Sequence, residues 1–364
     1  MRAQSIDDRS IRNIAFILLT LAIIIVGLVY GRPFLVPIVI AILITILVGA
    51  GADRLKRLGL PEPLATFSAL LILLTGIAVV FDVLASQADA VALAWPRYIE
   101  RLNVMGDQLL RWAGPQATGK VTEAIANLDL MRQIPGLVGS AGGVFVNLVL
   151  VTIYVGFLLA ERGRLSGKVD HLFSNIEHAG EMQRAIGAIS ESIRRYVWIK
   201  TIMALLTSGV SYAVLRTIGV DFAETWALII FLLNYVPSIG AIIGVMFPAL
   251  LALVQFDTLW QFFIIAALLA GAQLIIGNVL EPSLMGRTLN LSPFVVIASL
   301  AFWAMIWGIV GAFLSVPLTT ALIIVCSHIT SLRWVAVLLS ADSRAMLGAP
   351  AALSEETGAL NETL

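Results

Sequence analysis

Residues 225–256 read "TWALIIFLLNYVPSIGAIIGVMFPALLALVQF" and contain no charged side chain. Two further runs, 258–280 and 288–332, also lack Asp, Glu, Lys and Arg, and only the second holds a histidine, His328. About 20 predominantly apolar residues suffice to cross the hydrocarbon core of a bilayer. These runs therefore predict membrane-embedded helices and an all-α integral membrane protein.

The composition of the whole chain agrees with a membrane protein. Of its 364 residues, 59% are hydrophobic and 13% are charged, against about 25% charged residues in a typical soluble domain. The formal net charge is zero, so no basic footprint for nucleic acid is present. The single cysteine, Cys326, excludes a disulfide framework within the chain, and the three histidines lack metal-ligand spacing. We therefore expect no metal and no cofactor.

Four apolar runs near the N-terminus predict further membrane spans: 14–30, 34–50, about 64–84 and roughly 142–160. The first run lacks a small-residue cleavage site, so we expect it to be retained as a span. Residues 86–140 are mixed in character, and apolar side chains recur there at helical spacing, at Ile99, Leu102, Met105, Leu109 and Trp112. This spacing predicts an amphipathic helical segment outside the membrane, after the third span.

The order of apolar and polar segments predicts a division of the chain. The expected parts are a three-span region (1–85), the extramembrane amphipathic segment (86–140), the fourth span (141–160), a cytoplasmic helical segment (161–200), a C-terminal transport core (201–330) and a partly disordered cytoplasmic tail (331–364). Short loops rich in Lys and Arg mark the cytoplasmic side of a membrane. Basic residues at 54–57 and 162–168 therefore place both termini in the cytoplasm and residues 86–140 outside.

Two segments of the C-terminal half are interrupted by helix breakers. Residues 225–256 and 293–326 would each be roughly 50 Å long as straight helices, against a hydrocarbon core of about 30 Å. Both share spaced glycines followed by a proline, which indicates an internal repeat: Pro237, Gly240, Gly244 and Pro248 in the first, and Gly308, Gly311 and Pro317 in the second. Paired interruptions of this kind are typical of transporter binding sites. The alternative is that these residues only permit kinks and close helix packing.

Polar residues gather near the end of the apolar run that precedes "NVLEPSLMGRTLNLSP" (278–293). Asn278 and Glu281 are three residues apart and share a helix face. Pro282 ends the helix and Gly286 permits a turn. Such polar groups at membrane depth normally face a cavity or a partner. In the alternative interpretation, Glu281 sits at the headgroup level and pairs with Arg287.

The run from 196 to 322 resembles the autoinducer-2 exporter family of bacterial membrane proteins, also called the PerM-like permease family. The matching pieces are "YVWIKTIMALLTS", "NYVPSIGAIIGVMFPALLAL", "NVLEPSLMGRTLNLSP" and "WGIVGAFLSVPLTTAL". "WPRYIERL" and "FLLAERGRL" extend the resemblance more loosely to residues 14–330. The chain departs from the family at one place. Relatives often carry a polar residue near "YVWIK", and the polar residue that this chain has there is Lys200, so the resemblance assigns that position no role.

The resemblance implies about eight membrane crossings and export of a small solute, with an autoinducer-2-like signalling molecule as the name-giving case. Some relatives are described as sodium- or lithium-proton antiporters, which is the alternative function. The family also implies membrane lipid as a partner, a bacterial inner-membrane location and a homo-oligomer, for which a pentamer is expected. A channel or membrane scaffold is a further alternative, since small residues and broken helices also build pores. An enzyme is not expected, because the sequence offers no nucleophile–base pair or metal cluster.

We expect the solute pathway to use polar groups and breakers of the C-terminal half. Amides and backbone dipoles suit an uncharged polar solute, whereas a cation antiporter needs a membrane carboxylate. The pathway candidates are Asn234, Pro237, Gly240, Gln273, Asn278, Glu281, Pro282, Gly286, Gly308, Gly311 and Pro317. The coupling candidates are Glu281 and Asp257, the acidic residues of the C-terminal apolar half.

Overall fold

The computed structural model describes residues 8–113, 146–161, 176–285 and 291–341. Within these ranges the chain is helical, and the β contact that they hold is a single bridge between Leu291 and Ser340. The all-α prediction is therefore confirmed for this part of the chain. A helix satisfies its own backbone hydrogen bonds, which suits a chain embedded in lipid.

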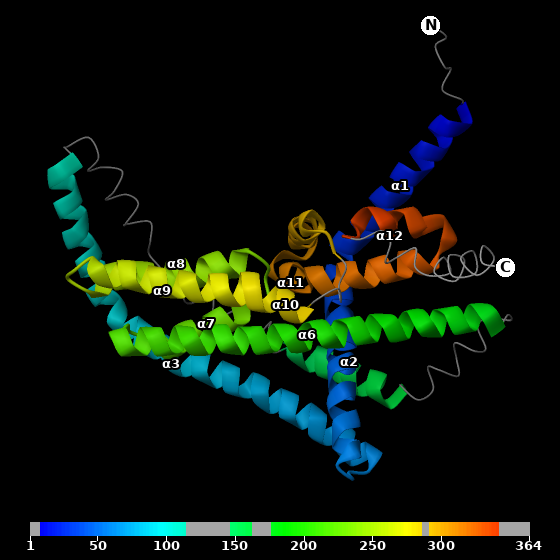
Figure 1. Cartoon of the computed structure of the whole chain (residues 1–364), viewed down its shortest axis with the longest axis horizontal. Helices are drawn as coiled ribbons and strands as arrows, with labels where there is room; N and C mark the ends of the chain where they lie inside the picture. The colour runs from blue at the N-terminus through cyan, green and yellow to red at the C-terminus, as the bar shows by residue number, and fades with distance from the viewer. Residues whose placement is uncertain (1–7, 114–145, 162–175, 286–290, 342–364) are drawn as a thin grey trace, which may run out of the picture. The chain divides into compact units, whose positions relative to one another are not determined.

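Figure 1 shows the described helices in their order along the chain. Their bounds are α1 Asp8–Tyr30, α2 Arg32–Arg57, α3 Glu62–Ala113, an unlabelled helix Val146–Glu161, α6 Ile176–Ile218, α7 Ala223–Leu233, α8 Ile239–Gln255, α9 Trp260–Ile275, the π-helix η1 Ile276–Leu280, α10 Glu281–Met285, α11 Pro293–His328, the 3₁₀ turn η2 Thr330–Leu332 and α12 Arg333–Leu339.

Five helical stretches of the described chain are long and apolar enough to cross a membrane. They are Arg32–Arg57, Glu62–Val80, Met182–Ile218, Trp260–Met285 and Pro293–His328. Shorter apolar helices lie at Ala15–Tyr30, Val146–Glu161, Ala223–Leu233 and Ile239–Gln255. The multi-pass membrane class is thus confirmed, whereas the number of about eight crossings stays a prediction.

The predicted division of the chain also stays a prediction. α3 runs unbroken from Glu62 to Ala113, so the expected boundary at 85 falls inside one helix, and residues 114–140 lie outside the described residues. The expected boundary at 200 likewise falls inside α6. Of the predicted tail, α12 is helical, and residues 342–364 are not among those described.

By its contacts the chain divides into two compact units. The first takes in Met1–Thr45, Leu150–Ala185 and Leu291–Leu364. In its core, Trp307 packs among apolar side chains of α1 and α2, and its indole N–H donates a hydrogen bond to the Leu28 carbonyl at 3.0 Å. α12 packs back on α11 through Ala336, which lies against Ile323 and Cys326.

The second unit takes in Ile46–Val149 and Ile186–Asn290. α8 and α9 lie side by side in it, with α7 packed on α8 (Figure 1). The end of α6 joins this layer through Leu215, which is buried with Ala252 of α8 and Ile265 of α9. The small side chains of α8 let these helices approach closely, as in other membrane bundles.

The first interrupted segment folds back on itself between α7 and α8. The turn between Leu233 and Ile239 includes Pro237 and places Ser238 at a left-handed φ of 60°. Gly240 then packs against α7 so closely that a Cβ there would lie 1.8 Å from the Leu233 carbonyl oxygen. A straight helix through this segment is therefore excluded.

The second interrupted segment, α11, also folds back, at Gly308. Gly308 has non-helical angles, φ 65° and ψ −144°. Across this break, the Trp303 indole donates a hydrogen bond to the Thr319 hydroxyl at 3.2 Å. In a straight helix these two residues, 16 positions apart, would lie about 24 Å from each other. Gly311 supplies the close approach, since a Cβ there would lie 1.9 Å from the Trp303 carbonyl oxygen. Both segments thus fold back at a break followed by a closely packed glycine, and the internal repeat stays a prediction.

Candidate functional site

A buried ion pair joins α6 to α10 within the second unit. The Lys200 ammonium lies 2.5 Å from a carboxylate oxygen of Glu281. The Lys200 side chain is 7% exposed and the Glu281 side chain 18%. Lys200 begins the apolar part of α6, and Glu281 lies near the end of the apolar stretch Trp260–Met285. Charged groups at such positions are costly unless paired, and they mark functional sites in membrane proteins.

A π-helical turn directs Glu281 toward Lys200. The backbone N–H of Glu281 bonds to the Ile276 carbonyl, five residues back, at the end of η1. Pro282 follows directly, and a proline inside a helix cannot donate a backbone hydrogen bond and clashes with the carbonyl four residues before it. The proline therefore gives a physical reason for the wider turn at this place. Single π turns inside α-helices are frequent at functional sites.

Two residues of α6 next to or one turn from Lys200 carry hydroxyl groups, and one of them bonds to the turn after α7. Thr201 follows Lys200 directly, and its hydroxyl donates to the Val197 carbonyl at 2.7 Å. Since that proton is used, the Tyr235 hydroxyl donates to Thr201 across 2.7 Å. Tyr196, one turn before Lys200, is buried and lies within electrostatic range of Glu281. A buried phenol thus lies near the ion pair, and the hydroxyl next to Lys200 in the sequence joins α6 to the turn after α7.

Apolar packing holds the two sides of the site together. Ile199 and Met203 of α6 form a buried cluster with Ile276 of η1. Ala272 of α9 and Met285 of α10 pack against this cluster. The helix that carries Lys200 and the turn that carries Glu281 are therefore fixed against each other by side chains on both sides of the ion pair.

The structure places three polar candidates of the second unit at different depths. Asn234 is buried, 7% exposed, at the end of α7 next to Tyr235. Gln273 is partly buried on α9, and its amide nitrogen lies 3.3 Å from where a Cβ of Gly277 would be. Asn278 lies in η1 on the surface of the single chain. Asn234 is thus a buried candidate, Gln273 is partly buried like Glu281, and Asn278 is exposed.

The other candidates are the breakers and Asp257. Pro237 and Gly240 form the α7–α8 turn, and Pro282 is exposed on α10. The Asp257 carboxylate pairs with the Arg101 guanidinium at an exposed position. Gly286, and the alternative partner Arg287, lie outside the described residues. Gly308, Gly311 and Pro317 belong to α11 of the first unit, where Gly311 and Pro317 are buried.

Sequence analysis missed Lys200 as the partner of Glu281. The two residues are 81 positions apart, so no local spacing connects them. The available signal was the isolation of Lys200 beside a long apolar run, since a lone membrane lysine needs a counter-charge.

A second polar cluster, also missed, joins the part of α3 beyond its apolar stretch Glu62–Val80 to the α6–α7 loop and the end of α8 in the same unit. Asp221 accepts hydrogen bonds from Arg97 at 2.5 Å and from the Tyr98 hydroxyl at 2.6 Å. Its backbone N–H donates to Gln255, whose amide in turn donates to the Gly219 carbonyl. Burial, and then the hydrogen bond to Asp221, raise the pKa of Tyr98 to about 12. Tyr98 therefore stays protonated and donates at neutral pH.

We expect Asp221→Ala to destabilise the protein, because it removes the acceptor of both Arg97 and Tyr98. The loss should be about 1–3 kcal/mol, the usual cost of leaving a buried polar group unsatisfied, because Tyr98 is buried whereas Arg97 can turn to water. Thermal unfolding of the purified protein in detergent measures it. Glu100→Ala is the control, because Glu100 is exposed and lies one turn after Arg97 on α3. Equal melting temperatures for both variants would contradict the expectation.

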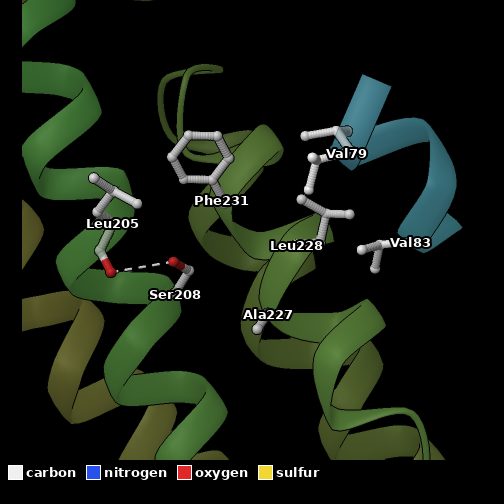
Figure 2. Close-up of a pocket in the computed structure, with 8 residues that line it drawn as sticks. Val79, Val83, Leu205, Ser208, Ala227, Leu228 and Phe231 are labelled. Atoms are coloured by element: carbon white, nitrogen blue, oxygen red, sulfur yellow. Dashed lines mark hydrogen bonds between the residues drawn. The ribbon is translucent and has the colours of Figure 1, made fainter. Parts of the chain in front are cut away.

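An apolar cavity of about 370 Å³ lies in the same unit, between α3, α6 and α7 (Figure 2). Its lining includes Val79, Val83, Leu205, Ser208, Leu228 and Phe231. The hydroxyl of Ser208 already donates to the Leu205 carbonyl at 3.1 Å, as the dashed line in Figure 2 shows. The cavity therefore suits an apolar group such as a lipid chain, and it offers a polar solute little to bind.

Comparison with known proteins gives matches over most of the chain. The profile described as AI-2E family transporter matches residues 16–331. The AI-2 transport protein TqsA of Escherichia coli K12 is 29% identical over 345 residues, which cover 90% of this chain and 95% of TqsA. YhhT of the same organism is 27% identical over 321 residues, covering 86% of this chain and 90% of YhhT. PerM, also from Escherichia coli K12, is 26% identical over 312 residues, covering 79% of this chain and 84% of PerM.

Proposed function

This chain belongs to the AI-2E transporter family, and on that premise we propose that it exports a small, uncharged polar solute of the autoinducer-2 type. The chain is a multi-pass membrane protein of a bacterial transporter family, and membership implies transport instead of catalysis. The name of TqsA, an AI-2 transport protein, supports this class of solute.

The observation that carries the proposal is the neutral polar site around Lys200 and Glu281. Its two charges cancel across 2.5 Å, the Tyr196 phenol lies within electrostatic range of Glu281, and the next residue of α6, Thr201, bonds to the Tyr235 hydroxyl. Asn234 adds a buried amide next to Tyr235. Hydroxyls, amides and a compensated ion pair can exchange hydrogen bonds with a hydroxylated solute without leaving a buried charge unpaired.

The α7–α8 hairpin, which belongs to the same unit as this site, is proposed as a moving or gating part. α7 has 11 residues, about 16 Å of helix, which is too short to cross a hydrocarbon core of about 30 Å. We therefore infer that the α7–α8 hairpin enters the membrane and returns, and that α11 does the same. The number of about eight crossings belongs to this proposal.

The alternative, a sodium- or lithium-proton antiporter, is less well supported by the charges. Both acidic coupling candidates of the C-terminal half have a cationic partner: Glu281 pairs with Lys200 and Asp257 pairs with Arg101. A coupling carboxylate must be able to release its partner for an ion or proton. This pairing favours a solute exporter over an antiporter.

The proposal is tested by uptake into proteoliposomes that contain the purified chain. Labelled autoinducer-2, a simple polyol and a carboxylated sugar are offered with and without imposed proton and sodium gradients. We expect uptake of the first above protein-free vesicles and little uptake of the charged sugar. Exchange of sodium or lithium for protons, without uptake of any neutral solute, would instead establish the antiporter.

The expected setting is the bacterial inner membrane, with both termini and residues 161–200 in the cytoplasm and residues 86–140 outside. A homo-oligomer, with five copies as the expected number, belongs to the same proposal, and light scattering of the detergent-solubilised protein measures it. Lipid is the surrounding partner.

Cysteine labelling tests this topology. In a Cys326→Ser background, Asp107→Cys should react with a membrane-impermeant maleimide in intact cells, because α3 extends there beyond its apolar stretch Glu62–Val80. Glu191→Cys, an exposed position on α6, should react only after the membrane is opened. The reverse pattern would overturn the orientation.

A further inference from the structure

Lys200 occupies the place at Glu281 that a coupling cation would otherwise take. Its ammonium contacts the carboxylate at 2.5 Å and is the more deeply buried of the two groups. Lys200 therefore covers the carboxylate oxygen that it contacts. A bound sodium ion or proton would have to displace a cation that is tethered to the backbone.

The surroundings of Glu281 otherwise resemble a site for a small cation. The Glu281 carboxylate lies at the end of a π turn, and the buried phenol of Tyr196 on α6 lies within electrostatic range of it. Carboxylate, hydroxyl and carbonyl oxygens at interrupted helices are the ligands that transporters use for coupling cations. The titratable side chains that the contacts place around Glu281 are Lys200 and Tyr196 of α6, with Tyr235 beside Thr201.

We propose that Lys200 is a built-in cation that replaces an exchangeable one at Glu281, so that the protein moves its solute without binding sodium, lithium or a proton at this carboxylate. This inference rests on the proposed export of an uncharged solute, and it names the residue that makes the site independent of a coupling ion. Lys200 thereby acts as a specificity-determining residue, because it selects against cations and keeps the site neutral.

The proposal requires that removal of the Lys200 charge creates a cation site. Lys200→Gln keeps a polar hydrogen-bonding side chain, one atom shorter, but leaves Glu281 with an uncompensated, partly buried negative charge. Such a carboxylate gains stability by binding sodium, lithium or a proton. Lys200→Arg keeps the tethered positive charge and should create no such site.

Thermal unfolding of the purified full-length protein tests the proposal without any need for transport. Melting temperatures are measured in sodium, lithium and N-methyl-D-glucamine chloride at equal ionic strength, and at several pH values in the last of these. A ligand that binds only the folded state raises the melting temperature with its concentration. We expect sodium, lithium or a lower pH to raise the melting temperature of Lys200→Gln, with a saturating shift of about 3 °C. Wild type, Lys200→Arg and Lys200→Gln/Glu281→Gln should show no such shift.

Two results would overturn the proposal. One is that the melting temperature of Lys200→Gln responds to alkali cations and to pH in the same way as that of wild type. The other is a sodium- or lithium-specific rise in the melting temperature of wild type that Glu281→Gln abolishes. This second result can be obtained even if Lys200→Gln is not recovered in folded form. Failure to transport autoinducer-2 would contradict the proposed function and leave these binding results unchanged, so the two failures are distinguishable.

Discussion

Glu281→Ala is expected to be severely destabilised and to lose transport, because it leaves the Lys200 ammonium buried without a counter-charge. Removing one partner of a buried ion pair costs about 3–5 kcal/mol. The Lys200 side chain is only 7% exposed, so it cannot reach water without a rearrangement of α6. Folded yield, melting temperature and solute uptake in proteoliposomes measure the effect.

The double variant Lys200→Met/Glu281→Met separates stability from function. Replacement of a buried ion pair by apolar side chains is often neutral or stabilising, so this protein should fold about as well as wild type. Its transport should nevertheless be at background, because the polar site is gone. A double variant as unstable as Glu281→Ala would contradict the pairing, and one that is folded and transports normally would remove the site from the pathway.

Gly240→Leu is expected to open the α7–α8 hairpin and abolish transport. Even the first side-chain atom would lie 1.8 Å from the Leu233 carbonyl oxygen, so the turn must move. Forced overpacking of this kind costs about 3 kcal/mol. Because Asn234 and Tyr235 lie in that turn, displacement also removes the Tyr235 hydrogen bond to Thr201.

Gly209→Leu is the matched control for this hairpin change. Gly209 lies on the exposed face of α6, and a Cβ there would meet nothing within 4 Å. Membrane insertion depends on overall apolarity, so both variants should reach the membrane in similar amounts. Equal transport by Gly240→Leu and Gly209→Leu would show that the hairpin can open without loss of function.

The helical hairpins show what the sequence could predict. Glycine and proline at 237–240 and at 308–317 indicated breaks inside uncharged runs, and both breaks are present. Whether each segment is one long helix or folds back on itself depends on whether backbone carbonyls before the break pack on glycines after it. That packing joins residues such as Trp303 and Gly311 across a turn, and it has no local sequence signature beyond the glycines.

The ion pair shows what the sequence could not predict. Glu281 was found as a lone acidic group at the end of an apolar run, but its predicted alternative partner was the neighbouring Arg287. The actual partner, Lys200, is distant in sequence, and the π turn before Pro282 sets the direction of the carboxylate. Partners of this kind follow from helix packing, which a single sequence does not specify.

Counterflow of labelled autoinducer-2 tests the central claim most directly. Proteoliposomes loaded with unlabelled autoinducer-2, in a medium free of sodium and lithium and at equal pH on both sides, are diluted into labelled autoinducer-2. The account predicts transient accumulation of label by wild type and none by the folded Lys200→Met/Glu281→Met protein. Accumulation by that variant at the wild-type rate, or by wild type only after sodium is added, would contradict it.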